Sequence, residues 1–244
     1  MAGLNEKEYS ILKIIGSNTS PSGSGAISRQ MKMLDNDISE ATIGRYLREL
    51  DHLGLTEKKG YMGRVLTSRG EAALDEYEHS KELQKNTALF MRLTKAEAKK
   101  ELLHILVARR AIERETCRLA AENIADEDLE ILTGIVDLHY EHVSSGRSGA
   151  KEDSLFHATI ARMSKNKLLA TALDLIRRDG YLSPVLEYIR ERVGSTIVAD
   201  HRKILEAISS RDPEAAEEAM VSHISNVMAD VNKYWDAANR ENGE

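Results

Sequence analysis

The chain has 244 residues, of which 41% are hydrophobic and 5% aromatic, and its formal net charge is −6 at pH 7. This composition supports a folded, mostly helical protein and excludes extensive disorder. The sequence has no apolar run as long as a membrane span and no signal-like start, and its single Cys117 excludes an internal disulfide. We therefore expect a cytoplasmic protein without a membrane partner.

The first seventy residues differ in charge from the rest of the chain. They hold ten Lys and Arg against eight Asp and Glu, a balance of +2, which leaves −8 for residues 71–244. This mild contrast suggests that the two parts have different partners.

The spacing of apolar residues in this first part predicts three short helices and a hairpin. The helices are expected over 6–17, 26–34 and 39–53, and two short strands over 55–59 and 64–67. Three small helices followed by a basic hairpin describe a winged helix-turn-helix, a DNA-binding fold.

The third of these helices has the composition of a recognition helix. Ile43, Leu47 and Leu50 mark its buried face, and Arg45 and Arg48 lie on the opposite face. Arginines placed in this way suit the major groove, although they can also be solvated surface charges. The residues expected to contact DNA on this helix and on the hairpin are Thr42, Arg45, Arg48, Lys58, Lys59 and Arg64.

A resemblance to a known family supports this interpretation. The segment Ile38 to Leu55, with Gly63-Arg64 and Leu66 to Gly70, resembles the small winged-helix domain of NrpR-type archaeal and bacterial regulators. The resemblance covers roughly the first seventy residues, and it implies double-stranded operator DNA as a partner.

The middle of the chain predicts a joint. The charged segment from Glu71 to about Met91 contains few helix breakers, which indicates a helix that leaves the hairpin and runs into a linker. We expect a DNA-binding domain over 1–79, a linker over 80–93 and a helical domain over 94–244.

The remaining residues predict an antiparallel all-α bundle of six or seven helices. The helices are expected over 94–123, 126–144, 152–164 and 165–178, then as one long helix from about Pro184 to Ser210, and finally from Asp212-Pro213 onward.

Four residues of this bundle form a candidate metal site. Asp153 and His157 are four residues apart, so they share one face of a helix. His201 and His223 lie on or beside apolar stripes of later helices. Each histidine alone could be a hydrogen-bonded core residue, but three with an aspartate favour coordination of a divalent ion.

The order and spacing of motifs over Leu102 to Tyr234 resemble the FCD domain, the ligand-binding domain of FadR-type GntR-family regulators. The motifs are Ala108-Arg109-Arg110-Ala111-Ile112-Glu113, Asp153-Ser-Leu-Phe156-His157, Ser164-Lys-Asn166, Asp200-His201 and Met220-Val-Ser-His223. The resemblance implies that Asp153, His157, His201 and His223 hold the ion, with zinc favoured and nickel or manganese also suitable.

The same resemblance implies a small organic acid as effector. Arg109 is expected to pair with its carboxylate, and the alternative is a salt bridge to Glu113 one turn later. Asn166 is a weaker candidate, with a helix N-cap as its alternative. Of the other histidines, His139 is expected at the surface and His104 in the core.

These patterns favour a ligand-responsive transcriptional regulator, expected to be a repressor and a homodimer, since operators are usually two-fold. The alternative is a metalloenzyme of hydrolase type that uses the three histidines and the aspartate, but no neighbouring general base is evident. A direct metal sensor or a structural metal site is a third possibility.

Overall fold

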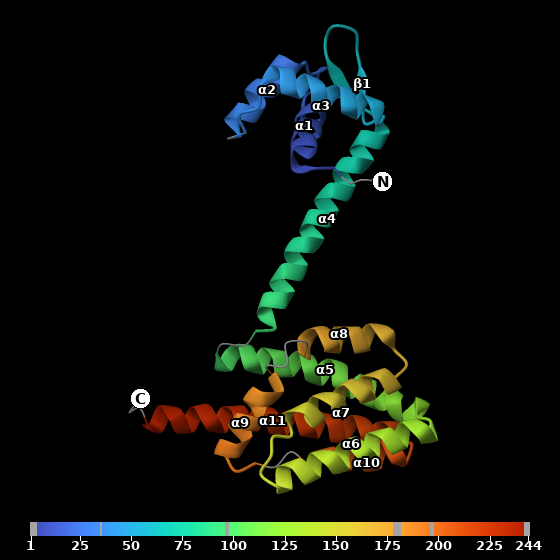
Figure 1. Cartoon of the computed structure of the whole chain (residues 1–244), viewed down its shortest axis with the longest axis vertical. Helices are drawn as coiled ribbons and strands as arrows, with labels where there is room; N and C mark the ends of the chain where they lie inside the picture. The colour runs from blue at the N-terminus through green and yellow to red at the C-terminus, as the bar shows by residue number, and fades with distance from the viewer. Residues whose placement is uncertain (1–3, 35, 96–97, 178–181, 196–197, 242–244) are drawn as a thin grey trace. The chain divides into compact units, whose positions relative to one another are not determined.

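The computed structural model describes residues 4–34, 36–95, 98–177, 182–195 and 198–241, without the side chains of residues 240 and 241. The chain divides into two compact units, Met1–Leu89 and Phe90–Glu244. Figure 1 shows the elements of each unit. None of the helices in the described part of the chain combines the length and the hydropathy that a membrane span requires.

The first unit is a winged helix-turn-helix. It contains helices α1 (Glu6–Ser17), α2 (Ser24–Met33) and α3 (Glu40–His52), strands β1 (Thr56–Lys58) and β2 (Arg64–Leu66), and most of α4 (Ser68–Leu93). The two strands are antiparallel, with Thr56 opposite Leu66 and Lys58 opposite Arg64.

Apolar stripes hold the three small helices together. Ile11, Ile27, Ile43 and Leu47 are fully buried in one cluster, as their helical spacing predicts. Ser39 caps α3 by accepting a hydrogen bond from the Thr42 backbone N–H at 3.3 Å.

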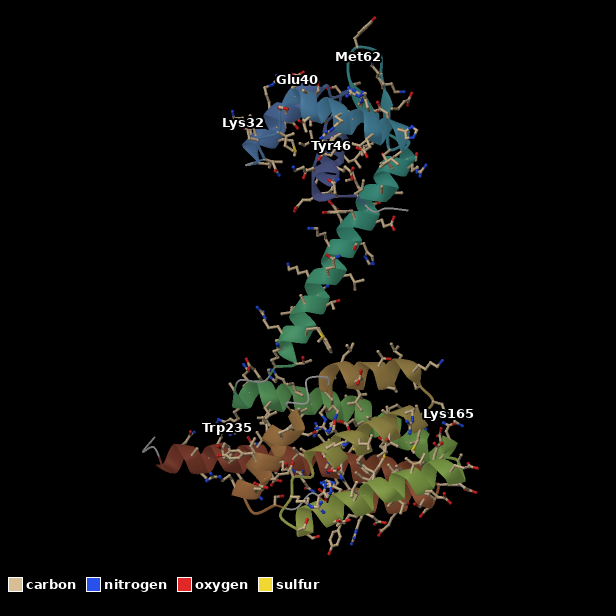
Figure 2. The ribbon with its side chains drawn as sticks, viewed as in Figure 1. Lys32, Glu40, Tyr46, Met62, Lys165 and Trp235 are labelled. Carbon is tan, nitrogen blue, oxygen red and sulfur yellow. The ribbon has the colours of Figure 1, made fainter. Side chains whose placement is uncertain are left out.

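The hairpin depends on a glycine. Gly63 has φ +127°, and a Cβ at this position would lie 2.3 Å from the carbonyl carbon of Ser22. The Ser22 backbone donates to and accepts from Arg64, which ties the loop before α2 to β2. Met62 at the tip of the hairpin is exposed (Figure 2).

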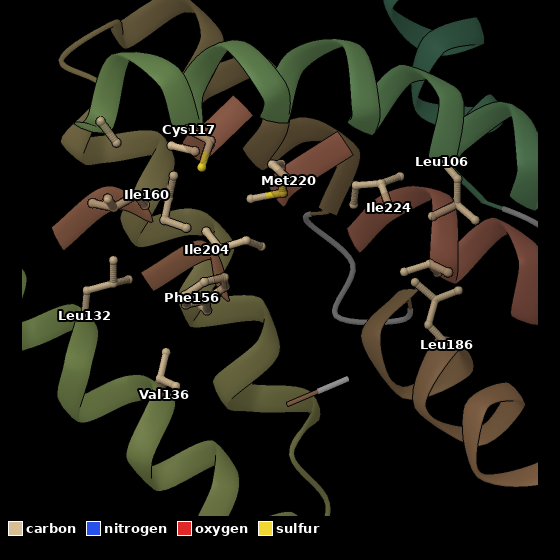
Figure 3. Close-up of a cluster of buried hydrophobic side chains, with 14 of the residues drawn as sticks. Leu106, Cys117, Leu132, Val136, Phe156, Ile160, Leu186, Ile204, Met220 and Ile224 are labelled. Carbon is tan, nitrogen blue, oxygen red and sulfur yellow. The ribbon is translucent and has the colours of Figure 1, made fainter. Parts of the chain in front are cut away.

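The second unit is a bundle of α5 (Lys99–Asn123), α6 (Asp126–Ser144), α7 (Ala150–Met163), α8 (Lys167–Arg177), α9 (Leu182–Arg192), α10 (Val198–Ser209) and α11 (Pro213–Glu241). The long helices α5 and α11 pack along each other, and α7 packs against α5, α6, α8 and α9. Figure 3 shows Phe156, Ile160, Ile204 and Met220 in the shared core.

The fold class is the one predicted, but two details of the bundle are corrected. The single helix expected from about Pro184 to Ser210 is wrong: α9 ends at Arg192, Gly194 has φ +67°, and α10 begins at Val198. A left-handed glycine ends a helix without the steric cost that a Cβ would add. The helix expected from residue 94 begins at Lys99, and residues 96 and 97 lie outside the described part.

Candidate metal centre

The four residues expected to bind metal lie together in the second unit. Asp153 and His157 come from α7, His201 from α10 and His223 from α11. One potential ligand atom from each residue lies within 4.8 Å of the others. Their exposed fractions are 7%, 1%, 0% and 1%. Residues far apart in sequence are therefore gathered around one small, dry volume.

Two of the histidine nitrogen atoms that face this volume have no hydrogen-bond partner among the described residues. Asp153 Oδ1 lies 3.6 Å from Nε2 of His157 and 3.6 Å from Nε2 of His201. Neither Nε2 atom makes a hydrogen bond to any described residue. Burying a polar group without a partner costs about 1–3 kcal/mol. A cation between these atoms would remove that cost.

Each histidine has a second contact through its other ring nitrogen. Nδ1 of His157 contacts Glu113 Oε2, and Nδ1 of His201 lies 3.1 Å from Nδ1 of His139. Nδ1 of His223 lies 3.5 Å from an oxygen of Asp200. Such outer partners orient metal-binding imidazoles and set their tautomers, which leaves Nε2 for the ion.

The aspartate is oriented in the same way. Asp153 Oδ2 accepts hydrogen bonds from Arg177 Nη2 at 2.8 Å and from Ser183 Oγ at 2.7 Å. The outer oxygen is therefore held by two donors, whereas Oδ1 points to the histidines. Asp153, His157 and His201 therefore have both an inner and an outer contact, and His223 has an outer contact to Asp200.

Electrostatics place these groups in the protonation states that metal binding requires. Burial lowers the pKa of His201 well below its usual value and lowers the pKa of His223 to about 4. Burial disfavours ionisation of Asp153, but His157, Arg177 and His201 outweigh it and hold the pKa of this carboxyl well below its usual range. At neutral pH His201 and His223 are therefore neutral and Asp153 is ionised, as binding of a divalent ion needs.

Three imidazole nitrogens and one carboxylate oxygen fit a borderline divalent ion such as zinc, nickel or manganese. The paired outer contacts fit a prepared metal site better than a set of independent core histidines. What such an ion would supply is Lewis acidity and open coordination positions for an oxygen ligand.

A pocket of about 100 Å³ adjoins this cluster, with Asp153 and Ser183 in its wall. Its lining also includes His139 from α6 and Arg190 from α9. Among the four candidate ligands, Asp153 is the one found in this lining, so the pocket meets the cluster on the α7 side.

The two residues expected to bind effector lie elsewhere. Arg109 and Glu113 are each 1% exposed and form a salt bridge, with Nε 2.5 Å from Oε1, as in the alternative considered above. Asn166 accepts a hydrogen bond from the Leu169 backbone N–H at 3.2 Å and so caps α8. The pocket lining includes neither Arg109 nor Asn166.

Two residues near the cluster were missed or misjudged from the sequence. His139 is 2% exposed, so its expected surface position is wrong, and it contacts His201. Arg190 is 4% exposed in the pocket wall. His104, expected in the core, is exposed instead.

In the first unit, Arg45, Arg48, Lys58 and Lys59 are exposed and Thr42 is half-buried. Arg64 differs from the rest. Its guanidinium forms a salt bridge to Asp51 of α3, with Nη2 2.9 Å from Oδ2, and 15% of its side chain is exposed. Arg64 thus fastens β2 to α3 and is not a free cation on the hairpin.

Comparison with known proteins agrees with this division. The FCD domain family matches residues 104–226, and the Ribonuclease R winged-helix domain family matches residues 9–74. The chain is 27% identical to the HTH-type transcriptional regulator LutR of Bacillus subtilis over 210 residues, which are 82% of this chain and 87% of LutR.

Two further similarities concern the first unit and the whole chain. The global nitrogen regulator NrpR of Methanocaldococcus jannaschii is 36% identical over 75 residues, 31% of this chain and 14% of NrpR. The structure of Streptococcus agalactiae GntR has a TM-score of 0.47 and 20% identity, with 93% of this chain and 100% of that chain covered.

The relatives are regulators, in agreement with the prediction that the chain is not an enzyme. The FCD match spans just over half of the chain and includes all four clustered ligands. The protein therefore belongs to the FCD domain family and is a transcriptional regulator.

Proposed function

We propose that the second unit binds a divalent metal ion and a small organic acid, and that the acid alters operator binding by the first unit. The observation that carries this proposal is the buried cluster of Asp153, His157, His201 and His223, with outer partners in place and a pocket beside it. In this proposal residues 1–79 are the DNA-binding domain, residues 80–93 the linker and residues 94–244 the metal- and effector-binding domain.

Zinc is the first candidate for the metal, because three imidazoles and one carboxylate suit zinc. Among ions of similar affinity, the availability of each ion determines which one binds. The acid would bind at the open side of the ion in the adjoining pocket. Metal content of the purified protein, measured by mass spectrometry, tests the first step. We expect one ion per chain, and none in a His201→Ala/His223→Ala variant.

For DNA binding, we propose that α3 enters the major groove with Arg45 and Arg48, while Lys58 and Lys59 contact the backbone. Both arginines are exposed on the face of α3 opposite its buried residues. Binding as a homodimer would match a two-fold operator. Repression relieved by the acid is the expected sign of regulation.

Fluorescence anisotropy with labelled DNA from upstream of the gene tests the recognition helix. Arg45→Ala/Arg48→Ala should weaken binding about 30-fold or more, since each arginine contact contributes about 1–3 kcal/mol. Lys7→Ala, an exposed charge on α1, is the matched control and should bind as the parent does. Undiminished binding by the double variant would reject the assignment.

A second arm separates an effector-controlled regulator from a direct metal sensor. Zinc alone should leave operator binding of metal-stripped protein largely unchanged, and zinc together with an organic acid should weaken it. If zinc alone produces the full change and no acid adds to it, the ion itself is the signal. If the protein folds and responds to the acid without metal, the ion has no central role.

A further inference from the structure

Arg190 is a buried cation in the pocket wall with no close partner. It extends the buried face of α9 that Leu182, Leu186 and Ile189 form, and it is 4% exposed. Its Nε and Nη1 atoms make no hydrogen bond to any described residue. The carboxylate paired with it, on Asp230, has its Oδ2 3.7 Å from Nε, beyond hydrogen-bond length, and that oxygen is also without a partner.

The other two buried arginines of the described chain each contact a carboxylate at hydrogen-bond distance, although Nη2 of Arg109 and Nε and Nη1 of Arg177 also lack partners. Arg109 Nε lies 2.5 Å from Glu113, and Arg177 Nη2 donates to Asp153 at 2.8 Å. Arg109 contacts Glu113, which contacts His157, and Arg177 contacts Asp153 directly. Neither arginine is in the pocket lining. Arg190 is the buried arginine that belongs to the pocket lining, and its carboxylate contact is longer than a hydrogen bond.

Leaving a guanidinium buried and incompletely paired is unfavourable by several kcal/mol. A carboxylate accepts two parallel N–H bonds from such a group and neutralises its charge. The pocket wall carries Asp153 as well as Arg190, so a ligand there lies beside both the guanidinium and the metal cluster. The pocket volume of about 100 Å³ is below the usual range for drug-sized ligands, which favours an acid of few carbons.

We propose that Arg190 is the residue that binds the carboxylate of the effector, and that Arg109 instead positions Glu113 and, through it, His157. The assignment deepens the proposed function and rests on it. It moves the anion-binding role from α5, where the family resemblance placed it, to α9.

The test uses the full-length, zinc-loaded protein and isothermal titration with acetate, malonate, succinate and citrate, with acetamide as a neutral analogue of acetate. The parent protein should bind at least one acid and should not bind acetamide. Arg190→Gln should lose about tenfold to hundredfold in affinity for that acid, as expected when a charge-assisted pair is removed. Arg190→Lys keeps the positive charge but loses the two parallel N–H donors of the guanidinium. Its affinity for the acid should therefore lie between those of the parent and Arg190→Gln.

Two variants and one independent readout separate a ligand contact from a structural effect. Arg192→Gln, at an exposed arginine of α9 that is not in the pocket lining, should retain acid binding, and Arg109→Gln should lose less than Arg190→Gln. Zinc affinity, measured by competition with a chelating dye, should be unchanged in Arg190→Gln. That result would show that the metal cluster is intact while the anion contact is lost.

Each other outcome has a definite meaning. If Arg190→Gln binds the acid like the parent while Arg109→Gln does not, the inference is overturned and the proposed function stands. The same holds if Arg190→Gln loses acid and zinc together, because the residue is then structural. If the parent binds zinc but none of the four acids, both the inference and the proposed carboxylate effector fail, whereas the DNA-binding assignment is untouched.

Discussion

Replacing Glu113 by Gln should weaken zinc binding although Glu113 is not a candidate ligand. The carboxylate is 1% exposed and lies between Arg109 Nε, at 2.5 Å, and Nδ1 of His157. It thereby forms an ion-pair contact with the outer nitrogen of His157 and balances the guanidinium charge of Arg109. Glutamine keeps the shape of the side chain and removes its charge.

Two effects of this change act in the same direction. His157 loses an anionic partner that strengthens it as a ligand, and loss of such an outer contact typically costs tenfold to a hundredfold in metal affinity. The Arg109 charge also becomes uncompensated inside the domain and repels the ion. We therefore expect the upper part of that range, about a hundredfold, which corresponds to about 2.7 kcal/mol.

Competition with a fluorescent zinc chelator at pH 7.5 measures the affinity, and circular dichroism checks the fold. Glu115→Gln is the matched control, because Glu115 is on the same helix, pairs with Arg118 and is partly exposed. Its affinity should equal that of the parent. In Arg109→Gln/Glu113→Gln both charges are absent, and part of the lost affinity should return.

A Glu113→Gln affinity within twofold of the parent, with His223→Ala clearly impaired, would refute the reasoning about the outer carboxylate. A double variant as weak as the single variant would reject the charge-balance part and leave only the contact with His157. The two variants together therefore separate the two effects.

Three further predictions follow from the described geometry. The metal-free protein should lose stability as pH falls from about 6.5 to 4. The reason is that His223, with its pKa at about 4, stays neutral in the folded protein while the unfolded chain takes up a proton at this residue. His223 accounts for up to about 3 kcal/mol of the free energy of unfolding, and urea unfolding with chelator at pH 7.5 and 5 measures the loss. Gly63→Ala, which brings a Cβ against Ser22 at a positive φ, should cost about 2–4 kcal/mol of stability in the first unit and reduce DNA binding while zinc affinity stays normal. Gly149→Ala would place a Cβ 2.5 Å from Nε2 of His139, and the displaced ring should lower zinc affinity about tenfold in the dye competition; unchanged affinity would mean that this ring does not support the site.

The spacing of apolar residues was sufficient to predict most helices of both units. In α3, for example, Ile43, Leu47 and Leu50 recur at helical intervals and are all fully buried. Such stripes work because burial of apolar area is local to a helix face and repeats with the helix period. The break between α9 and α10 was not predicted, since it depends on the left-handed conformation of Gly194 and on packing that a helical pattern does not record.

Polar residues within the stripes were the weaker part of the sequence interpretation. His139 continues the series Leu132, Ile135 and Val136 of α6, so the helix period itself places it inside, and this signal could have found it. By the same rule His104 falls between the buried positions of α5 and is exposed. The sequence neighbours suggested the opposite in both cases, whereas the position in the helix period gives the observed burial.

The sequence predicts the candidate ligands better than it predicts their outer contacts. Asp153 and His157 are one turn apart, and their shared face follows from helix geometry alone. The outer contacts join separate helices, as with Glu113 of α5 and His157 of α7. Which buried cation lacks a hydrogen-bonded carboxylate, as Arg190 does, depends on the whole set of neighbours and cannot be predicted from one segment.

The nearly complete burial of the four ligands also sets how fast an ion could be exchanged. Asp153 is the ligand that the described lining connects to the pocket, and the other three are at most 1% exposed. Entry and exit through that lining would pass His139, Ser183 and Arg190, the same groups that an acid in the pocket would cover. A bound acid would therefore lengthen the residence time of the ion without strengthening any bond between the protein and the ion. The arrangement of α7 and α9 would also set the order of binding, with the ion first and the acid second.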